Sequence, residues 1–305
     1  MVVEATTGRV SARRTVAAYV ALTKPRIIEL LLVTTVPTMI VADRGMPSVW
    51  LIAVTVIGGT LAAGGANAYN MVLDRDIDAM MRRTRHRPLV TGEIAPGGAT
   101  VFATALEVAA FLVLALAVNV LAAVLAVAAT AFYVVVYTMW LKRRSSQNIV
   151  IGGAAGAAPV LIGWAAVTGS LSWTPIVLFA IIFIWTPPHF WALAVRYRDD
   201  YEAANVPMLP VVASPQRTTL EILVYTVALW ATTVLFGAVA AMGPIYGVTA
   251  FALGATFTWL SAALYRDACH DRADAAKAMR LFGFSITYLM LLFASMAADV
   301  LVRHH

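Results

Sequence analysis

Nine stretches of about 20 predominantly apolar residues run through this sequence, and they restrict its possible folds more than any other feature. A helix needs roughly 20 apolar residues to cross the hydrocarbon core of a bilayer, because each residue advances it by only about 1.5 Å. The stretches cover residues 24–42, 49–72, 98–118, 120–141, 148–168, 174–195, 218–240, 245–265 and 281–300. The sequence therefore predicts an all-α, polytopic membrane protein with nine transmembrane helices.

The composition argues against a soluble protein. Only 12% of the 305 residues are charged, and the mean hydropathy is +0.81. Soluble domains carry about 25% charged residues, because their surface must face water. The single cysteine, Cys269, also excludes an internal disulfide framework and a Cys-x2-Cys metal or redox site.

The Lys and Arg residues are distributed unevenly between the two sides of the predicted bundle. If the N-terminus lies in the cytosol, nearly all of the 22 basic residues fall in cytosolic segments, and only Arg44 and Arg303 do not. Lys and Arg are enriched in the cytosolic connections of membrane proteins. The pattern predicts an N-in, C-out topology, with residues 1–22 as a basic cytosolic tail and residues 23–305 as one transmembrane domain. This distribution of Lys and Arg explains the basic pI, so the pI does not indicate a nucleic acid as partner.

The end of the second span carries the first candidate site. Asn70, Asp74 and Asp78 are spaced by four residues, so on a helix they lie along one face at steps of about 6 Å. Asp76 falls between them and points elsewhere. Mg²⁺ binds carboxylate oxygens, keeps several waters and fills its shell with substrate phosphates. The spacing favours a metal ladder over the alternative, a helix end solvated by acidic and basic residues.

Basic residues follow this ladder at once, in the sequence Arg82-Arg83-Thr84-Arg85-His86-Arg87-Pro88-Leu89. The guanidinium group suits bidentate contacts with phosphate oxygens. The ladder and Arg83-Thr84-x2-Arg87-Pro88-Leu89 together resemble the first signature of the UbiA-type intramembrane prenyltransferases. The resemblance extends from Lys24-Pro25 to the last span.

This resemblance implies a nine-helix enzyme that binds a prenyl diphosphate through Mg²⁺. Asn70, Asp74 and Asp78 are then the expected metal ligands and catalytic residues. The expected diphosphate-binding residues are Arg83, Arg87, Lys142, Arg143, Arg196, Tyr197 and Tyr201. An apolar groove open to membrane lipid would hold the prenyl tail.

A second acidic motif follows the sixth span, at the same predicted membrane face. The family usually carries Asp-x3-Asp there, but this chain has Tyr197 and Tyr201 at those positions, with Asp199 and Asp200 between them. We expect Asp200 to act at a second metal position, with Asp199 nearly equivalent. The tyrosines become candidate hydrogen-bond partners of the diphosphate.

The same span resembles the haem-modifying branch of the family, through Thr186-Pro187-Pro188-His189-Phe190-Trp191-Ala192-Leu193-Ala194. That branch implies transfer of a farnesyl group from farnesyl diphosphate to a vinyl group of haem B, with addition of water, to give haem O. His189 and Trp191 are the candidate haem-binding residues, since a neutral imidazole can ligate iron or accept a proton. His189 is also a candidate catalytic residue, together with Asp200. A histidine that only packs inside the bundle remains the alternative.

Two other functions remain open at this stage. Another member of the family could act on an aromatic quinone precursor or a chlorophyllide, and the segment around His189 argues against that. A transporter or scaffold with a metal-binding mouth would need no diphosphate. The alanine- and valine-rich spans, with no long presequence, suggest a bacterial plasma membrane, and the distribution of Lys and Arg predicts active-site loops in the cytosol. The expected partners are haem A synthase or terminal oxidase assembly.

Overall fold

The computed structural model describes residues 12–270 and 275–303, except for the side chains of residues 26–32. Within these ranges the chain forms helices and no strand. The long helices are α2 (Pro25–Asp43), α3 (Val49–Leu73), α5 (Pro96–Ala117), α6 (Val120–Ala131) with its continuation η1 (Phe132–Leu141), α7 (Asn148–Thr168), α8 (Trp173–Arg196), α11 (Pro215–Val239), α12 (Pro244–Cys269) and α13 (Ala275–Arg303). The short helices are α1 (Ala12–Thr23), α4 (Arg75–Met80), α9 (Arg198–Ala203) and α10 (Leu209–Val212).

The long helices coincide with the apolar stretches of the sequence. In the described part of the chain, 8 helices are long and apolar enough to cross a membrane, from Val49–Leu73 to Ala275–Arg303. They confirm a polytopic, all-helical membrane protein. The first expected span, 24–42, corresponds to the 19-residue helix α2, of which Val33–Asp43 counts as a shorter apolar helix.

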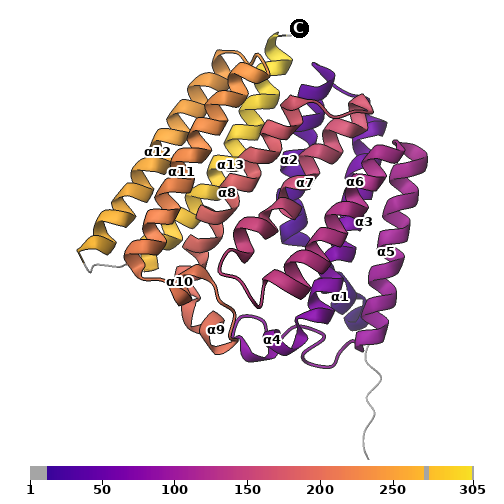
Figure 1. Cartoon of the computed structure of the whole chain (residues 1–305). Coiled ribbons are helices and arrows are strands. Elements are labelled where there is room, and N and C mark those ends of the chain that lie inside the picture. Colours follow the sequence, from indigo (N-terminus) through magenta and orange to yellow (C-terminus); the bar gives the residue numbers. More distant parts are fainter. Residues whose placement is uncertain (1–11, 271–274, 304–305) are drawn as a thin grey trace, which may run out of the picture.

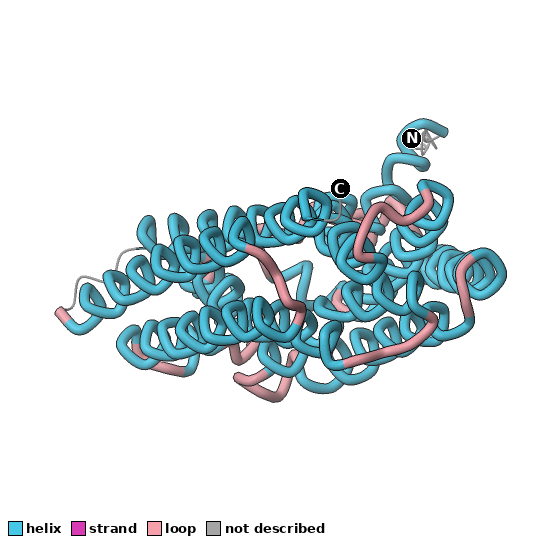
Figure 2. Tube along the Cα trace, turned by 90° about the horizontal axis from the view of Figure 1, so that it is seen from above, coloured by secondary structure: helices cyan, strands magenta, loops and turns pink. Residues whose placement is uncertain are grey.

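The long helices form a closed ring. Each packs against the next long helix in the chain, and α13 packs back against α2. Contacts of α2 with α7 and of α8 with α13 also cross the ring and divide it into two halves. Figure 1 shows α11, α12, α13 and α8 on one side and α2, α7, α6, α3 and α5 on the other. The view from above in Figure 2 shows that the bundle is longer in one direction than in the other.

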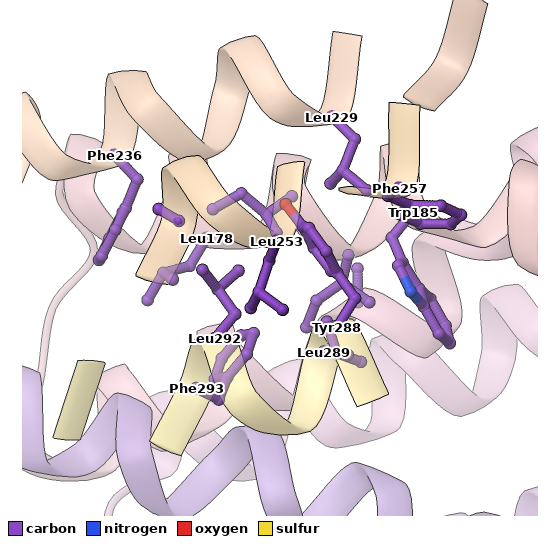
Figure 3. Close-up of a cluster of buried hydrophobic side chains, with 14 of the residues drawn as sticks. Leu178, Trp185, Leu229, Phe236, Leu253, Phe257, Tyr288, Leu289, Leu292 and Phe293 are labelled. Carbon is purple, nitrogen blue, oxygen red and sulfur yellow. The ribbon is translucent and has the colours of Figure 1, made fainter. Parts of the chain in front are cut away.

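The largest apolar core lies in the half that contains α8, α11, α12 and α13. Figure 3 shows side chains from all four helices meeting there, including Leu178, Phe236, Phe257 and Tyr288. The outward surface is apolar as well, since residues such as Leu116 and Trp173 are about four-fifths exposed. A soluble protein rarely exposes such side chains over a large area, so lipid is the solvent that fits this surface.

The short helices gather at one end of the bundle. Figure 1 shows α4, α9 and α10 at the end opposite to the C-terminus, with α1 close to them. An apolar cluster joins these segments, and it includes Ile77 of α4, Ile149 of α7 and Tyr201 of α9. The two acidic sequence motifs therefore lie at the same end of the protein.

Candidate active site

A row of three polar side chains runs from the end of α3 into α4. Helical hydrogen bonding continues across the junction, because the Asp74 N–H donates to Asn70 O at 2.9 Å and the Asp78 N–H to Asp74 O at 2.8 Å. Asn70, Asp74 and Asp78 are all buried, with 3%, 0% and 3% exposure. The Asp76 side chain is 61% exposed, on another face of the helix. The structure thus brings the predicted ladder together, and we refer to Asn70, Asp74 and Asp78 as the ladder.

Each residue of the ladder faces a cationic side chain from another segment of the chain. Lys24, between α1 and α2, donates to Asn70 Oδ1 at 2.8 Å. Lys142, after η1, forms an ion pair with Asp74 Oδ2, and Arg87 pairs with Asp78 Oδ2 at 2.6 Å. Three cationic side chains therefore surround the ladder, and this positive charge favours binding of an anionic ligand.

Arg143 adds a further cation at the edge of the ladder. Its guanidinium nitrogens contact both carboxylate oxygens of Asp76 at 2.7 Å, in a bidentate pair. This pair holds the pKa of the Asp76 carboxyl at about 2, well below its usual range. Arg143 Nη2 also lies 4.0 Å from Asp74 Oδ1. Arg143 therefore approaches the ladder while Asp76 anchors it.

The π-helical segment η1 supplies the wall opposite the ladder. Thr138 Oγ1 accepts a hydrogen bond from Asn70 Nδ2 at 3.1 Å and donates to Tyr133 O, five residues earlier, at 2.9 Å. π-Helical turns are rare and often occur at functional sites. The segment lies close to α7, because a Cβ on Gly152 would lie 2.3 Å from the Tyr137 ring. Glycine at 152 therefore permits the position of η1.

One oxygen of the ladder has no hydrogen-bond donor. Asp74 Oδ1 is enclosed and accepts no hydrogen bond from a described residue, with Arg143 Nη2 4.0 Å away, whereas Asn70 Nδ2 donates to Oδ2 at 2.7 Å. A buried carboxylate oxygen without a donor is costly unless a ligand satisfies it. The described residues gather no group of three or more His, Cys, Asp or Glu side chains as a metal site. Two carboxylates and an amide oxygen nevertheless fit Mg²⁺, which leaves several positions to water and phosphate.

A cavity of about 480 Å³ opens beside the ladder, between α1 and the connection that follows α4. It is lined by polar side chains from Arg14, Lys24, His86, Arg87 and Glu93 and by apolar atoms of α1 and α3. Two of these residues, Lys24 and Arg87, also contact the ladder. The cavity and the ladder therefore share two cationic side chains.

The second acidic motif lies in and around α9. Asp199 is exposed and Asp200 is half-buried. Arg83 from the first motif lies over the Tyr197 ring, 5.6 Å from its centre, while Tyr201 is buried against Ile77. Burial raises the pKa of the Tyr201 hydroxyl, and the neighbouring Arg83 opposes that shift. Arg83 thus links the two motifs.

The remaining site candidates are separated by the structure. Arg196, the last residue of α8, is exposed and forms no ion pair with a described residue. His189 points toward α13, where its Nδ1 lies 2.7 Å from Ser285 Oγ. Trp191 is fully buried and packs edge-on against Tyr225 of α11. Residues two apart on a helix face opposite ways, so His189 and Trp191 do not meet on one surface.

Two residues of this site do not stand out in the sequence. Lys24 lies in the segment that resembles the family, but in the sequence it is only one of several basic residues near the N-terminus. Its contact with Asn70 is visible only in the structure. Thr138 reads as one polar residue in an apolar span. The sequence feature that could have indicated Thr138 is its position four residues before Lys142, because residues four apart lie on the same face of a helix.

The chain belongs to the UbiA prenyltransferase family, whose model matches residues 31–287. The protein named "Protoheme IX farnesyltransferase" of Leifsonia xyli subsp. xyli is 52% identical over 296 residues, which cover 97% of this chain and 95% of that protein. "Protoheme IX farnesyltransferase 1" of Saccharopolyspora erythraea is 55% identical over 287 residues, covering 94% and 91%.

Solved structures share the fold at low sequence identity. A digeranylgeranylglyceryl phosphate synthase structure gives a TM-score of 0.77 at 15% identity and covers 94% of this chain and 99% of its own. A UbiA homologue from Archaeoglobus fulgidus, bound to GPP and Mg²⁺, gives 0.61 at 17% identity, covering 92% and 99%. These likenesses confirm the UbiA-type helical bundle.

Proposed function

We propose that this protein transfers a farnesyl group from farnesyl diphosphate to a vinyl group of haem B, with addition of water, to give haem O and diphosphate. The acceptor and the prenyl group rest on relatives that are 52–55% identical over nearly the whole chain. The observation that carries the reaction type is the buried ladder, with one carboxylate oxygen that accepts no hydrogen bond from a described residue and a cation at each of its three residues.

The ladder is the proposed metal site. Asn70, Asp74 and Asp78 would hold Mg²⁺, with Asp200 or Asp199 at a second position across the mouth. When bound, the metal would offset negative charge on the diphosphate as it departs. A UbiA homologue that binds GPP and Mg²⁺ supports this assignment. The exposed and half-buried positions of Asp199 and Asp200 leave both free to approach a ligand.

The basic residues around the ladder are the proposed diphosphate site. Arg87 and Lys142 pair with carboxylates in the absence of substrate, so phosphate oxygens would compete for the same groups. Arg83, Tyr197 and Tyr201 lie together on the side of α9. Arg143 and the exposed Arg196 extend the positive surface outward. Cations at several angles hold the leaving diphosphate and prevent its return.

The chemical change breaks the bond between C1 of the farnesyl group and oxygen, the π bond of the vinyl group and one O–H bond of water, and it forms one C–C bond and one C–O bond. The bond between C1 of the farnesyl group and the bridging oxygen breaks, and the diphosphate leaves with the electron pair. The terminal vinyl carbon then bonds to C1, and the porphyrin stabilises the cation that develops on the adjacent carbon. Water adds to that carbon and loses a proton. The apolar bundle limits entry of water before the first bond forms.

The haem acceptor is proposed to lie near His189, with its iron or its propionates held by polar groups of the bundle. His189 is 8% exposed, and its Nδ1 lies 2.7 Å from Ser285 Oγ of α13. Trp191 would support this region from the core rather than by contact, because it packs against Tyr225.

The proposed setting is a bacterial plasma membrane. The distribution of Lys and Arg supports nine spans with a cytosolic N-terminus, so that residues 1–22 form a tail and residues 23–305 one transmembrane domain. The active-site end would then face the cytosol, where farnesyl diphosphate is available. Haem A synthase or terminal oxidase assembly would receive the product.

The direct test is mass analysis of haems extracted after incubating purified protein with haem B, farnesyl diphosphate and Mg²⁺. We expect a heavier haem that carries one hydroxyethylfarnesyl group and is absent when Mg²⁺ is chelated. The variant Glu221→Gln, which changes a surface ion pair of α11, is the matched control and should retain product formation. An unmodified haem pool, beside an active positive control, would reject the haem acceptor.

A further inference from the structure

His189 is enclosed by a group of side chains that the reaction itself does not require. Its ring lies between Trp185, at 4.1 Å, and Phe282, at 4.6 Å, with interplanar angles of 19° and 28°. Its Nδ1 lies 2.7 Å from Ser285 Oγ. Trp185 Nε1 donates to Ser285 O at 2.9 Å, so α8 and α13 are joined at this point. Figure 3 shows Trp185 at the edge of the large apolar core.

The hydrogen bonds around Ser285 determine which ring nitrogen carries the proton. A serine hydroxyl has one hydrogen to donate. Ser285 Oγ donates it to Phe282 O at 2.6 Å, and a carbonyl oxygen can only accept. Ser285 Oγ therefore accepts from His189, and the neutral imidazole must carry its proton on Nδ1. The lone pair then lies on Nε2.

The surroundings leave Nε2 available for a ligand. Nε2 forms no hydrogen bond with any residue that the structure describes, and His189 keeps 8% exposure. A metal bound to imidazole lies in the ring plane, along the nitrogen lone pair. The rings of Trp185 and Phe282 stack on the imidazole, and the ring of Phe190 meets it edge-on at 5.4 Å, so the three rings restrict its rotation.

We propose that Ser285 is a positioning residue that holds His189 in the Nδ1–H tautomer, with Nε2 directed at the iron of the haem acceptor. Histidines that ligate metals commonly donate their second ring proton to a neighbouring oxygen, which fixes the tautomer and raises ligand basicity. Ser285 would act through His189 and would not touch the haem. This inference rests on the proposed haem substrate.

The first experiment measures the resting protein and needs no variant of Ser285. Uniform ¹⁵N labelling of histidine in the full chain, compared with His189→Gln, assigns the His189 resonances by difference. We expect one protonated nitrogen at Nδ1 and one unprotonated nitrogen at Nε2. A proton on Nε2 would overturn the inference.

The second experiment titrates purified protein with haem B, without prenyl diphosphate, and records the absorption and electron paramagnetic resonance of the iron. We expect a nitrogen-ligated spectrum in the wild type that disappears in His189→Gln. Ser285→Ala should weaken haem binding by about tenfold, the lower range for loss of such a partner, and Ser285→Thr should restore it. The melting temperature of each variant separates this effect from unfolding.

The outcomes distinguish this inference from the proposed function. An unchanged iron spectrum in His189→Gln, or equal haem binding by Ser285→Ala and the wild type, would overturn the positioning role even if haem O is still formed. Absence of haem binding and of haem product in the wild type would overturn both proposals.

Discussion

Two aspartates of this protein are fully enclosed at opposite ends of the bundle, and their surroundings differ in kind. Asp299 of α13 accepts hydrogen bonds from the backbone N–H groups of Gly243, Ile245 and Tyr246, at 2.5, 3.1 and 3.3 Å. Both of its oxygens are satisfied, and Arg303 lies 3.8 Å away. Its partners are fixed parts of the backbone at the start of α12.

Asp74 has the same burial but different partners. Its Oδ2 contacts the side chains of Asn70 and Lys142, and its Oδ1 has no hydrogen-bond donor among the described residues. Lysine and arginine side chains can turn to another anion, whereas a backbone N–H at a helix start cannot. The satisfied carboxylate therefore stabilises the fold, and the unsatisfied one is available for a ligand. Burial alone does not distinguish the two roles.

The largest expected effect is on activity at the ladder. Asp74→Asn should lower the rate of haem O formation by at least about 100-fold, because it removes a charged ligand where diphosphate charge develops. The melting temperature in detergent separates this loss from a loss of stability, because Asp74→Asn also removes the charged partner of Lys142, whose side chain is only 16% exposed. Asp76→Asn, two residues along the same helix and largely exposed, should cost far less activity. Equal losses in the two variants would remove the distinction between ladder and surface.

The next effect is on stability at the other end. Asp299→Asn should lower the free energy of unfolding by about 2–3 kcal/mol, because buried backbone N–H groups lose a charged acceptor. The rate of the molecules that remain folded should stay close to that of the wild type. Thermal unfolding in detergent measures this, with Asp43→Asn, an exposed aspartate at the same end, as the control. A large rate loss without loss of stability would contradict a structural role.

The smallest effect concerns the residue that orients the ladder. Thr138→Val keeps the side-chain shape but removes the acceptor of the Asn70 amide, so the Mg²⁺ concentration for half-maximal rate should rise about tenfold. Thr138→Ser keeps the hydroxyl and should behave like the wild type. An Mg²⁺ dependence that is identical in all three proteins would show that Asn70 needs no such support.

The sequence predicts the local features of this protein well. Hydropathy over about 20 residues locates the spans, because each helix must satisfy its own backbone in lipid. The ladder follows from helical spacing, and the continuous hydrogen bonds through Asp74 make that spacing valid. These features depend on residues close together in the chain.

Contacts between distant residues could not be predicted in this way. Lys24 meets Asn70 46 positions later, and His189 meets Ser285 96 positions later. Such pairs depend on how the helices rotate about their axes, and apolar spans with no polar face give little information on rotation. For the same reason the sequence grouped His189 with Trp191, which face opposite sides of α8.

The π-helical winding of η1 has a consequence for how this membrane helix can be altered. A wider turn takes more residues for each revolution, so the segment Phe132–Leu141 delivers Lys142 to the ladder at an angle that an α-helix of equal length would not. An α-helix with fewer residues could direct Lys142 toward the ladder as well. An α-helix with the same number of residues would direct Lys142 away from it. This segment therefore determines the direction in which Lys142 points, in addition to the chemical identity of its residues.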